Sequence, residues 1–338
     1  MKITIMGTGS WGTALAQVLA DNHQDVLLYG INPEQIRDIN ENHRNTAFFE
    51  TPINENLRAT DDISCVKDAD IVLLAVPSQA IESVVVSLKQ YLTHPVIVIN
   101  VAKGFHPVTH ERLSEIVRRN MDEHLLTDVV SLIGPSHAEE VILRLLTAVN
   151  AVCIHEESAK IVQNLFANDY FRVYTNTDEI GAEIGVSVKN VMAIASGILH
   201  GLGQGDNARA ALMTRGLAEM TRYGVSRGGR QSTFLGLDGV GDLIVTCTSF
   251  HSRNFMAGYA IGKADSAEEF LRTNKKTVEG IAASKVLYEE SKKNHISMPI
   301  TEQVYKILYE GKIPSQAIHE LMLRDLKPET IRTPERVF

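Results

Sequence analysis

Lys189 is a candidate for acid–base chemistry because of the residues that share its helix face. The apolar periodicity of residues 179–200 predicts a helix, and every fourth position of it is either small or Lys189. A lysine on such a face loses hydration, so it needs either a charged partner or a catalytic role. Burial lowers the pKa of an amine toward neutrality, which suits acid–base catalysis. The glycines are equally well explained by close helix packing. The members of this face are Gly181, Gly185, Lys189, Ala193 and Gly197.

A partner for Lys189 is predicted in the glycine-rich bend over residues 236–243. The bend carries two carboxylates, Asp238 and Asp242, and either of them could orient the amine. The same half of the chain contains Ser252-Arg253-Asn254, with Ser252 in position to cap a helix. A forked cation beside free backbone donors would bind a phosphate, whereas the alternative is an arginine that only faces solvent.

A second candidate site is the turn after the first predicted strand, residues 2–6. Gly7, Gly9 and Gly12 form the pattern G-x-G-x-x-G between this strand and a helical segment. Gly7 permits the tight turn, Gly9 leaves room for a pyrophosphate, and Gly12 lets the helix approach the strand. A glycine-rich turn can be purely structural, but its position before a second strand at 25–29 favours a dinucleotide site.

The end of that second strand leaves the choice between NAD and NADP open. An acidic residue there is typical of NAD enzymes and a nearby arginine of NADP enzymes. The chain reads Gly30-Ile31-Asn32-Pro33 instead. Asn32 is expected to cap the helix that begins at Pro33, with contact to the ribose as the alternative.

Further polar residues follow other apolar runs, at 70–76, 96–101 and 129–133. Ligands of open α/β sheets collect where strands end, so Lys103 is a candidate for binding an anion or a carbonyl oxygen, against a solvated loop lysine. Ser136 and Glu139 have the spacing of a capping box at the start of a helix. His137 beside them is either an acid–base group or a surface histidine.

These segments predict the fold class: α/β, with an N-terminal Rossmann-type doubly wound, mostly parallel sheet followed by an all-α C-terminal domain. Runs at 148–154 and 171–174 complete the alternating pattern, and from Asp178 onward the segments have only helical spacing. We predict a dinucleotide-binding domain over 1–178, an all-helical substrate and catalytic domain over 179–326, and a loose tail over 327–338.

Composition excludes several classes of function. The chain has 41 acidic and 33 basic residues and a net charge of −8, which argues against a nucleic-acid partner. Its three cysteines fit a reducing cytoplasm and neither a disulfide framework nor a zinc site. No cleavable signal sequence is expected, and apolar runs such as 71–76 are shorter than a membrane span.

Ten stretches, in order, resemble the bacterial glycerol-3-phosphate dehydrogenases that use NAD or NADP. The resemblance implies reversible hydride transfer between a nicotinamide and C2 of dihydroxyacetone phosphate or sn-glycerol 3-phosphate, supplying glycerophospholipid synthesis. It also implies a cytoplasmic homodimer with a small phosphorylated substrate and no metal. The stretches are GTGSWGTALA, VPSQ, AKG, GPSHAEEV, FRVYTNTD, VSVKNVMAIASGI, GDNARAALMTRGLAEM, GLDGVGDLIVTCTS, SRNF and TVEG.

The resemblance also assigns roles to matching positions. Lys189 matches the catalytic acid–base and Asp242 its substrate-side partner, and both contact substrate. The expected coenzyme contacts are Gly7, Gly9, Ser10, Trp11, Gly12, Lys103, Ala138, Arg253 and Glu279; the other expected substrate contacts are Lys103, Gly134, Ser136, Ser252, Arg253 and Asn254.

Two departures and two alternatives accompany this assignment. Arg144-Leu145-Leu146 stands where the family has small residues and a proline, and Ile31 stands where many relatives have a polar or basic coenzyme contact, which weakens an NADP assignment. A two-domain β-hydroxy acid dehydrogenase and a non-catalytic dinucleotide-sensing module are the alternatives. Coenzyme preference, feedback inhibition and oligomer size stay open.

Overall fold

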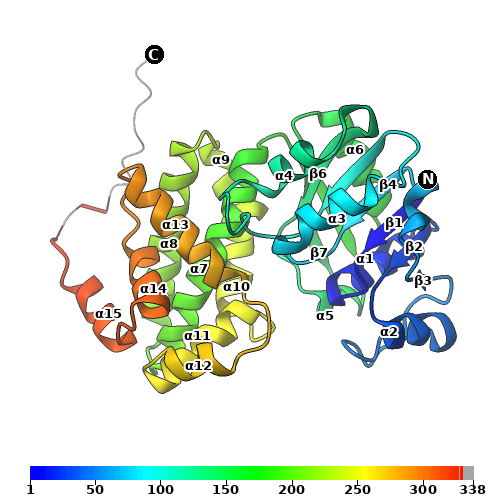
Figure 1. Ribbon diagram of the computed structural model, residues 1–338. Helices are drawn as coiled ribbons and strands as arrows, with labels where there is room; N and C mark the ends of the chain where they lie inside the picture. The colour runs from blue at the N-terminus through cyan, green and yellow to red at the C-terminus, as the bar shows by residue number, and fades with distance from the viewer. Residues whose placement is uncertain (327, 330–338) are drawn as a thin grey trace, which may run out of the picture. The chain divides into compact units, whose positions relative to one another are not determined.

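The computed structural model describes residues 1–326 and 328–329, and it divides into two compact units, Met1–Glu179 and the chain from Ile180 onward (Figure 1). All but two residues of the predicted tail, 327–338, lie outside the described residues. The functions predicted for 1–178 and 179–326 stay predictions at this point.

The first unit is built on one eight-stranded sheet in the order β3-β2-β1-β4-β5-β6-β7-β8. Every neighbouring pair is parallel except β6 and β7, which are antiparallel. The mostly parallel sheet is therefore confirmed. The strands are β1 (Lys2–Met6), β2 (Asp25–Tyr29), β3 (Arg58–Thr60), β4 (Ile71–Leu74), β5 (Val96–Asn100), β6 (Leu126–Ile133), β7 (Thr147–Val152) and β8 (Phe171–Asn176).

Helices cover both faces of this sheet, which explains why its central strands are continuously apolar. In β4, Ile71 and Leu73 pack into one core with α1 (Ser10–Asp21), α5 (Ala138–Val141) and α6 (Glu156–Phe166). Val72 and Leu74 point into the other core, with α3 (Ile81–Leu88) and α4 (Leu113–Asn120). The short helix α2 (Pro33–Arg37) follows β2. The predicted doubly wound arrangement is thus confirmed.

In its described residues the second unit consists of helices joined by turns and loops and has no strand. Its central element, α7, supplies the face that carries Lys189. The helices are α7 (Glu179–Gly201), α8 (Asp206–Ser226), α9 (Gln231–Phe234), α10 (Asp242–Thr248), α11 (Arg253–Ala264), α12 (Glu268–Thr273), α13 (Glu279–Lys293), α14 (Pro299–Tyr309) and α15 (Pro314–Met322).

Glycines let α7 and α11 approach each other closely. A Cβ on Gly197 would lie 2.1 Å from the Phe255 oxygen, and a Cβ on Gly258 would lie 2.0 Å from the Ile194 oxygen. No side chain fits at such separations, so these glycines are explained by helix packing. Among the described residues α7 also has the length and composition of a membrane span, but its whole apolar window is buried inside the protein, as in a core helix.

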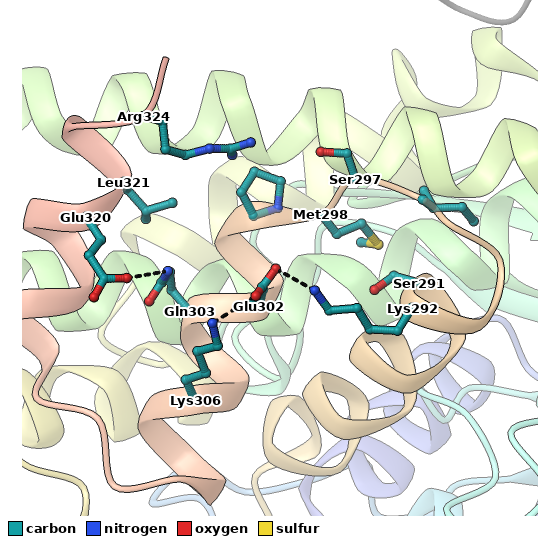
Figure 2. A pocket seen from close by; sticks show the side chains of 12 residues that line it. Ser291, Lys292, Ser297, Met298, Glu302, Gln303, Lys306, Glu320, Leu321 and Arg324 are labelled. Atoms are coloured by element: carbon teal, nitrogen blue, oxygen red, sulfur yellow. Dashed lines mark hydrogen bonds and ion pairs between the residues drawn. The ribbon is translucent and has the colours of Figure 1, made fainter.

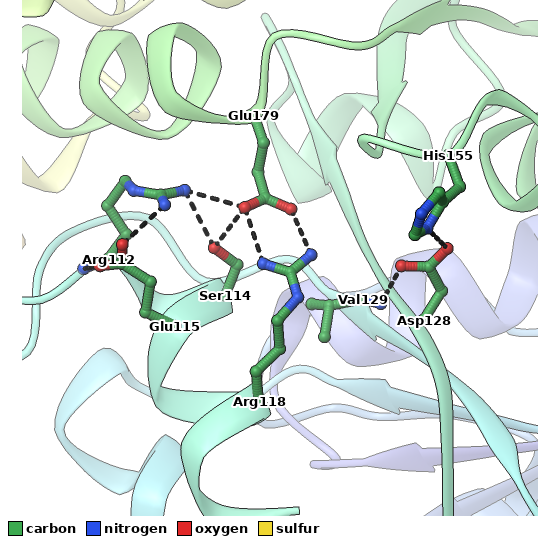
Figure 3. Close-up of polar contacts among 8 residues, drawn as sticks. All are labelled: Arg112, Ser114, Glu115, Arg118, Asp128, Val129, His155 and Glu179. Carbon is green, nitrogen blue, oxygen red and sulfur yellow. Dashed lines mark hydrogen bonds and ion pairs between the residues drawn. The ribbon is translucent and has the colours of Figure 1, made fainter. Parts of the chain in front are cut away.

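The first residue of α7, Glu179, is held within the first unit by α4 (Figure 3). Arg118 donates two hydrogen bonds to its carboxylate, of 2.8 and 2.6 Å, and Arg112 donates a third of 2.9 Å. Ser114 donates a further bond of 3.0 Å. Burial by itself raises the pKa of Glu179, but the two guanidinium groups outweigh it and hold the pKa below its ordinary value. Glu179 is therefore held against α4 by a buried ion cluster within the first unit.

Candidate functional site

The turn after β1 has the geometry that its glycines require. Gly7 has a φ of +127°, and a Cβ there would lie 2.6 Å from the Ala75 oxygen. A Cβ on Gly12 would lie 2.2 Å from the Gly7 oxygen, so α1 approaches the turn without space for a side chain. A Cβ on Gly9 would meet nothing within 4 Å, and no side chain caps α1 at this residue. Open space in front of the uncapped α1 N-terminus, which begins with Ser10 and Trp11, fits a pyrophosphate.

A buried amide that the sequence reading missed supports this turn. Asn45 has no exposed surface, and its Nδ2 donates to the Thr8 oxygen and to the Thr13 Oγ1, each at 2.9 Å. The Thr8 hydroxyl donates to Gln35 Oε1 of α2 at 2.7 Å. Gln35 and Asn45, which are distant in sequence, therefore hold the turn by hydrogen bonds. No local sequence pattern identifies Asn45.

Lys103, Gly134 and Ser136 converge where β5 and β6 end. The Lys103 amine donates to the Gly134 oxygen at 3.0 Å, and the Ser136 hydroxyl donates to the same oxygen at 3.2 Å. Lys103 is thus anchored by one of its expected companions and is not a free loop lysine. Since β1, β4, β5 and β6 are parallel, these residues lie at the same edge of the sheet as the glycine turn.

The predicted capping box at Ser136 and Glu139 is wrong. The helix α5 begins one residue later than that pattern requires, at Ala138, with His137 as its N-cap residue and no side-chain cap. The Ser136 hydroxyl instead donates to the Gly134 oxygen, because the chain at Ser136 is not yet helical. Ala138, an expected coenzyme contact, is buried in the first turn of α5.

Asn32 is the cap of α2, as the sequence predicts. Its Oδ1 accepts hydrogen bonds from Glu34 N at 2.9 Å and Gln35 N at 3.3 Å. Ile31 beside it is 85% exposed. The end of β2 therefore presents an apolar side chain, and the Asn32 amide is already used as a cap.

In the helical unit, Lys189 is buried against Asp242 and Thr246. Lys189 is 4% exposed, and its Nζ donates to Asp242 Oδ1 and to Thr246 Oγ1, each at 2.7 Å. The Thr246 hydroxyl donates in turn to the same Asp242 oxygen at 3.2 Å. Of the two carboxylates that the sequence left open, Asp242 is the one that binds the amine. Gly185 has a structural task, since a Cβ there would lie 2.4 Å from the Asp238 oxygen.

The Ser252-Arg253-Asn254 stretch forms the first turn of α11. Ser252 caps the helix by accepting from Phe255 N at 3.2 Å, as predicted. Arg253, whose side chain is 54% exposed, binds Glu279 Oε1 at 2.7 Å. The structure therefore brings together the two residues of the helical unit that are expected to contact coenzyme.

Asn254 links this turn to α7 and to the TVEG segment. Its Nδ2 donates to Asn190 Oδ1 at 3.0 Å, and its Oδ1 accepts from Gly280 N at 2.8 Å. Asn190 follows Lys189 directly, so one helix carries both the amine and the support for the Ser252 turn. The TVEG segment thus supplies Glu279 and Gly280 to this cluster.

One sizeable cavity of the helical unit lies apart from these residues. It has a volume of about 440 Å³ and is bordered by α13, α14 and α15 (Figure 2). Its charged groups largely bind one another: Glu302 accepts from Lys292 at 3.0 Å and from Lys306 at 2.8 Å. None of the predicted site residues lines it, so it is not the candidate site.

The mostly parallel sheet with its glycine turn and the helical unit with its Lys189–Asp242 pair have the arrangement expected of a two-domain dehydrogenase, and the comparisons with known proteins agree with this class. The family model described as the NAD-dependent glycerol-3-phosphate dehydrogenase N-terminus matches residues 2–159, and its C-terminal counterpart matches 178–319. The chain belongs to the NAD-dependent glycerol-3-phosphate dehydrogenase family.

Individual relatives agree with this assignment. The glycerol-3-phosphate dehydrogenase (NAD(P)+) of Streptococcus mutans is 46% identical over 330 residues, 97% of each chain. The protein of the same name from Streptococcus pyogenes serotype M5 is 47% identical over 97% of this chain and 98% of its own length.

Solved structures show the same fold. Glycerol-3-phosphate dehydrogenase from Coxiella burnetii superimposes with a TM-score of 0.89 at 36% identity, covering 96% of this chain and 99% of its own. A D-mandelate dehydrogenase structure gives a TM-score of 0.63 at 15% identity, covering 94% of this chain and 100% of its own, which shows a shared fold alone.

Proposed function

We propose that this protein catalyses the reversible reduction of dihydroxyacetone phosphate to sn-glycerol 3-phosphate with NADH or NADPH. The product would supply glycerophospholipid synthesis. The observation that carries the proposal is the buried Lys189–Asp242 pair, whose lysine lies on α7 next to Asn190, the residue that supports the Ser252 turn. The matches to the family along both units support it.

Lys189 is the proposed proton donor. As an ammonium group it gives a proton to the C2 oxygen of the ketone, so that no alkoxide is left, and it regains a proton from solvent afterwards. When bound, the coenzyme supplies the hydride that C2 receives. Asp242 keeps the amine charged and, with Thr246, fixes its direction.

Arg253 and the first turn of α11 are the proposed phosphate site. Arg253 uses one nitrogen for Glu279 and retains other donors of its fork, while Ser252 keeps its hydroxyl proton after accepting from Phe255. Asn254 retains one amide hydrogen beyond its bond to Asn190. Holding the phosphate would fix the ketone relative to Lys189, and positioning of this kind accounts for several kcal/mol of barrier, on the order of 7 in favourable cases.

The coenzyme is proposed to bind at the glycine turn and along the same edge of the sheet. Gly7, Gly9, Ser10, Trp11 and Gly12 would hold the pyrophosphate, with Lys103 and Ala138 from the neighbouring strand ends. Lys103, Gly134 and Ser136 would also contact the substrate. In this proposal, residues 1–178 form the coenzyme-binding domain and residues 179–326 form the substrate-binding domain.

The direct test is the oxidation of NADH and of NADPH, measured side by side with dihydroxyacetone phosphate. Lys189→Met should lower kcat by at least about 10²-fold, as expected for the loss of a general acid, whereas Lys285→Met, which changes an exposed lysine of α13, should not. Near-native turnover of Lys189→Met would remove the amine from the chemistry.

A second pair of variants tests the phosphate site. Arg253→Ala should raise KM for dihydroxyacetone phosphate much more than KM for coenzyme, and Arg272→Ala, an exposed arginine of α12, should change neither. A β-hydroxy acid without phosphate that turned over faster than the phosphorylated substrates would favour the alternative dehydrogenase.

We also propose that the protein works in the cytoplasm as a homodimer with no nucleic-acid partner. The family resemblance supports the dimer, and the net charge of −8 argues against nucleic acid. Light scattering coupled to gel filtration tests the dimer, since a mass of 37.3 kDa would show a monomer.

A further inference from the structure

Three potential metal ligands meet at one corner of the first unit. Asp128 lies near the start of β6, Cys153 directly follows β7, and His155 is the N-cap residue of α6. One ligand atom from each, a carboxylate oxygen, a thiol sulfur and a ring nitrogen, lies within 4.8 Å of the others. They meet because β6 and β7 are antiparallel, with Ser131 opposite Val152.

The group of Asp128, Cys153 and His155 is buried on one side and open to solvent on the side of His155. Asp128 and Cys153 are 6% and 0% exposed, whereas the His155 side chain is 69% exposed. One Asp128 oxygen accepts from Val129 N at 3.0 Å and the other lies 2.9 Å from His155 Nδ1 (Figure 3). The Cys153 sulfur lies within 4.8 Å of the ligand atoms of the other two residues.

This corner is remote from the proposed coenzyme site. Asp128 is the third residue of β6, whereas Gly134 and Ser136 follow the end of the same strand. The glycine turn follows β1, which runs parallel to β6 in the sheet, so it lies at the opposite edge from Asp128. The trio is therefore separate from the residues proposed for hydride transfer.

We propose that Asp128, Cys153 and His155 bind a divalent cation of the Zn²⁺ class, with solvent water completing the coordination. A thiolate, an imidazole and a carboxylate are ligands that suit zinc, and three protein ligands with one open position are a common arrangement. Binding displaces the thiol proton of Cys153, while neutral His155 binds through one ring nitrogen and keeps its proton on the other, and no oxidation or reduction takes place. One thiolate and one carboxylate neutralise the two charges of the ion.

Occupancy would tie the β6 strand to the β7–α6 connection. The three ligands belong to separate elements, so an ion bound only in the folded state would stabilise the first unit by mass action. The site would be structural, and turnover would not depend on it.

Cobalt titration of the metal-free protein tests the proposal. Co²⁺ is the probe because a cobalt–thiolate bond gives a charge-transfer band in the near ultraviolet. We expect this band in the wild type and its loss when Zn²⁺ is added. Cys153→Ser should abolish it, and Cys65→Ser, which changes a half-buried thiol outside the trio, should retain it.

His155→Ala provides a second arm in case Cys153→Ser folds poorly. Because the His155 side chain is mostly exposed, this variant should fold and keep its dehydrogenase activity, yet bind Co²⁺ at least tenfold more weakly. His124→Ala, an exposed histidine of the same unit, is the matched control. The absence of a band in the wild type, or a band of unchanged affinity in His155→Ala, would overturn the proposal.

Discussion

The Lys189 amine and the Thr246 hydroxyl lie 2.7 Å apart, and both donate to the same oxygen of Asp242. Thr246 is one turn beyond Asp242 on α10, so a single helix presents two acceptors to the amine. The charge of the amine is balanced by the aspartate, and its direction is fixed by both side chains.

Thr246→Val should lower kcat about tenfold with little change in KM. Valine keeps the branched shape but removes one hydrogen bond to the amine, and a loss of about 1.4 kcal/mol corresponds to one factor of ten in rate. Steady-state kinetics with dihydroxyacetone phosphate measures the effect. Thr248→Val, which changes an exposed threonine of the same helix whose hydroxyl donates to the Ile244 oxygen, should be neutral; equal losses in both variants would indicate a general effect on α10.

Arg144, one of the departures from the family pattern, combines an unusual backbone with an ion pair. Its φ is +59°, in the left-handed region, and its guanidinium binds both oxygens of Asp21, at 2.8 and 3.1 Å. Asp21 also accepts from Tyr170, at 2.8 Å. Burial by itself raises the pKa of Asp21, but its hydrogen bonds, with the one from Arg144 first, hold the pKa below the ordinary value.

Arg144→Ala should therefore destabilise the protein more than Arg144→Gly. Both variants lose the pair with Asp21, but only alanine keeps a side chain at a positive φ, which costs roughly 1 kcal/mol relative to glycine. Urea unfolding at neutral pH should show this order. The reverse order would mean that the backbone at residue 144 relaxes out of the left-handed region once the ion pair is lost.

The sequence predicted the sheet well because its signal is local. Strand β2 has the predicted bounds, and β5 was predicted one residue too long, since apolar runs mark buried parallel strands. Strand β3 was missed because its three residues, Arg58–Thr60, give no recognisable pattern. The reversed direction of β7 was not predicted either, because an apolar run looks the same in both orientations.

The site was predicted less completely because its contacts are between distant segments. Lys189 stood out as a charge on a small-residue face, but the residue pattern left Asp238 and Asp242 open as its partner. The family resemblance favoured Asp242, and the fold shows that Asp242 binds the amine. Thr246 and Asn190 were missed, since an ordinary threonine and asparagine become significant only through their partners. The roles of all these residues stay predictions until the variants are measured.

Glu219 shows the same difference between sequence and structure, and it predicts a pH effect. Its spacing from Arg215 suggests an ion pair along α8, but its carboxylate instead accepts from Ile300 N at 2.6 Å and Thr301 N at 3.2 Å, at the start of α14. Burial raises the pKa of Glu219 to about 7 despite these bonds.

The free energy of unfolding should consequently fall as the pH rises from about 4.5 to about 7, because Glu219 loses its proton across this range. The folded state holds the Glu219 proton more tightly than the unfolded chain, so ionisation favours unfolding across that window, by about 3 kcal/mol in total. Glu219→Gln cannot ionise and should lack this contribution. Urea unfolding at pH 5 and pH 8 gives the difference between wild type and variant at each pH; a difference that stays constant would exclude the titration of Glu219.

Asn45 is the last residue for which the geometry predicts a measurable role. Its Nδ2 donates to the Thr8 oxygen and the Thr13 hydroxyl, so it holds the backbone of the glycine turn from the buried side. Asn45→Asp keeps the shape but replaces the donor with a second acceptor facing the Thr8 oxygen. The turn should then shift, and NADH should bind roughly tenfold more weakly, as expected for the loss of a buried hydrogen bond worth about 1.4 kcal/mol.

NADH fluorescence titration measures this without turnover, and thermal unfolding shows whether the variant is folded. Asn40→Asp is the matched control, because the hydrogen bonds of the Asn40 amide run to the backbone of Ala59, at 2.9 Å to its oxygen and 2.8 Å from its nitrogen. Its NADH affinity should be unchanged. If both variants bind NADH as the wild type does, the glycine turn keeps its shape without Asn45, and the positions of Gly7, Gly9 and Gly12 are determined by the close packing of β1 and α1 alone.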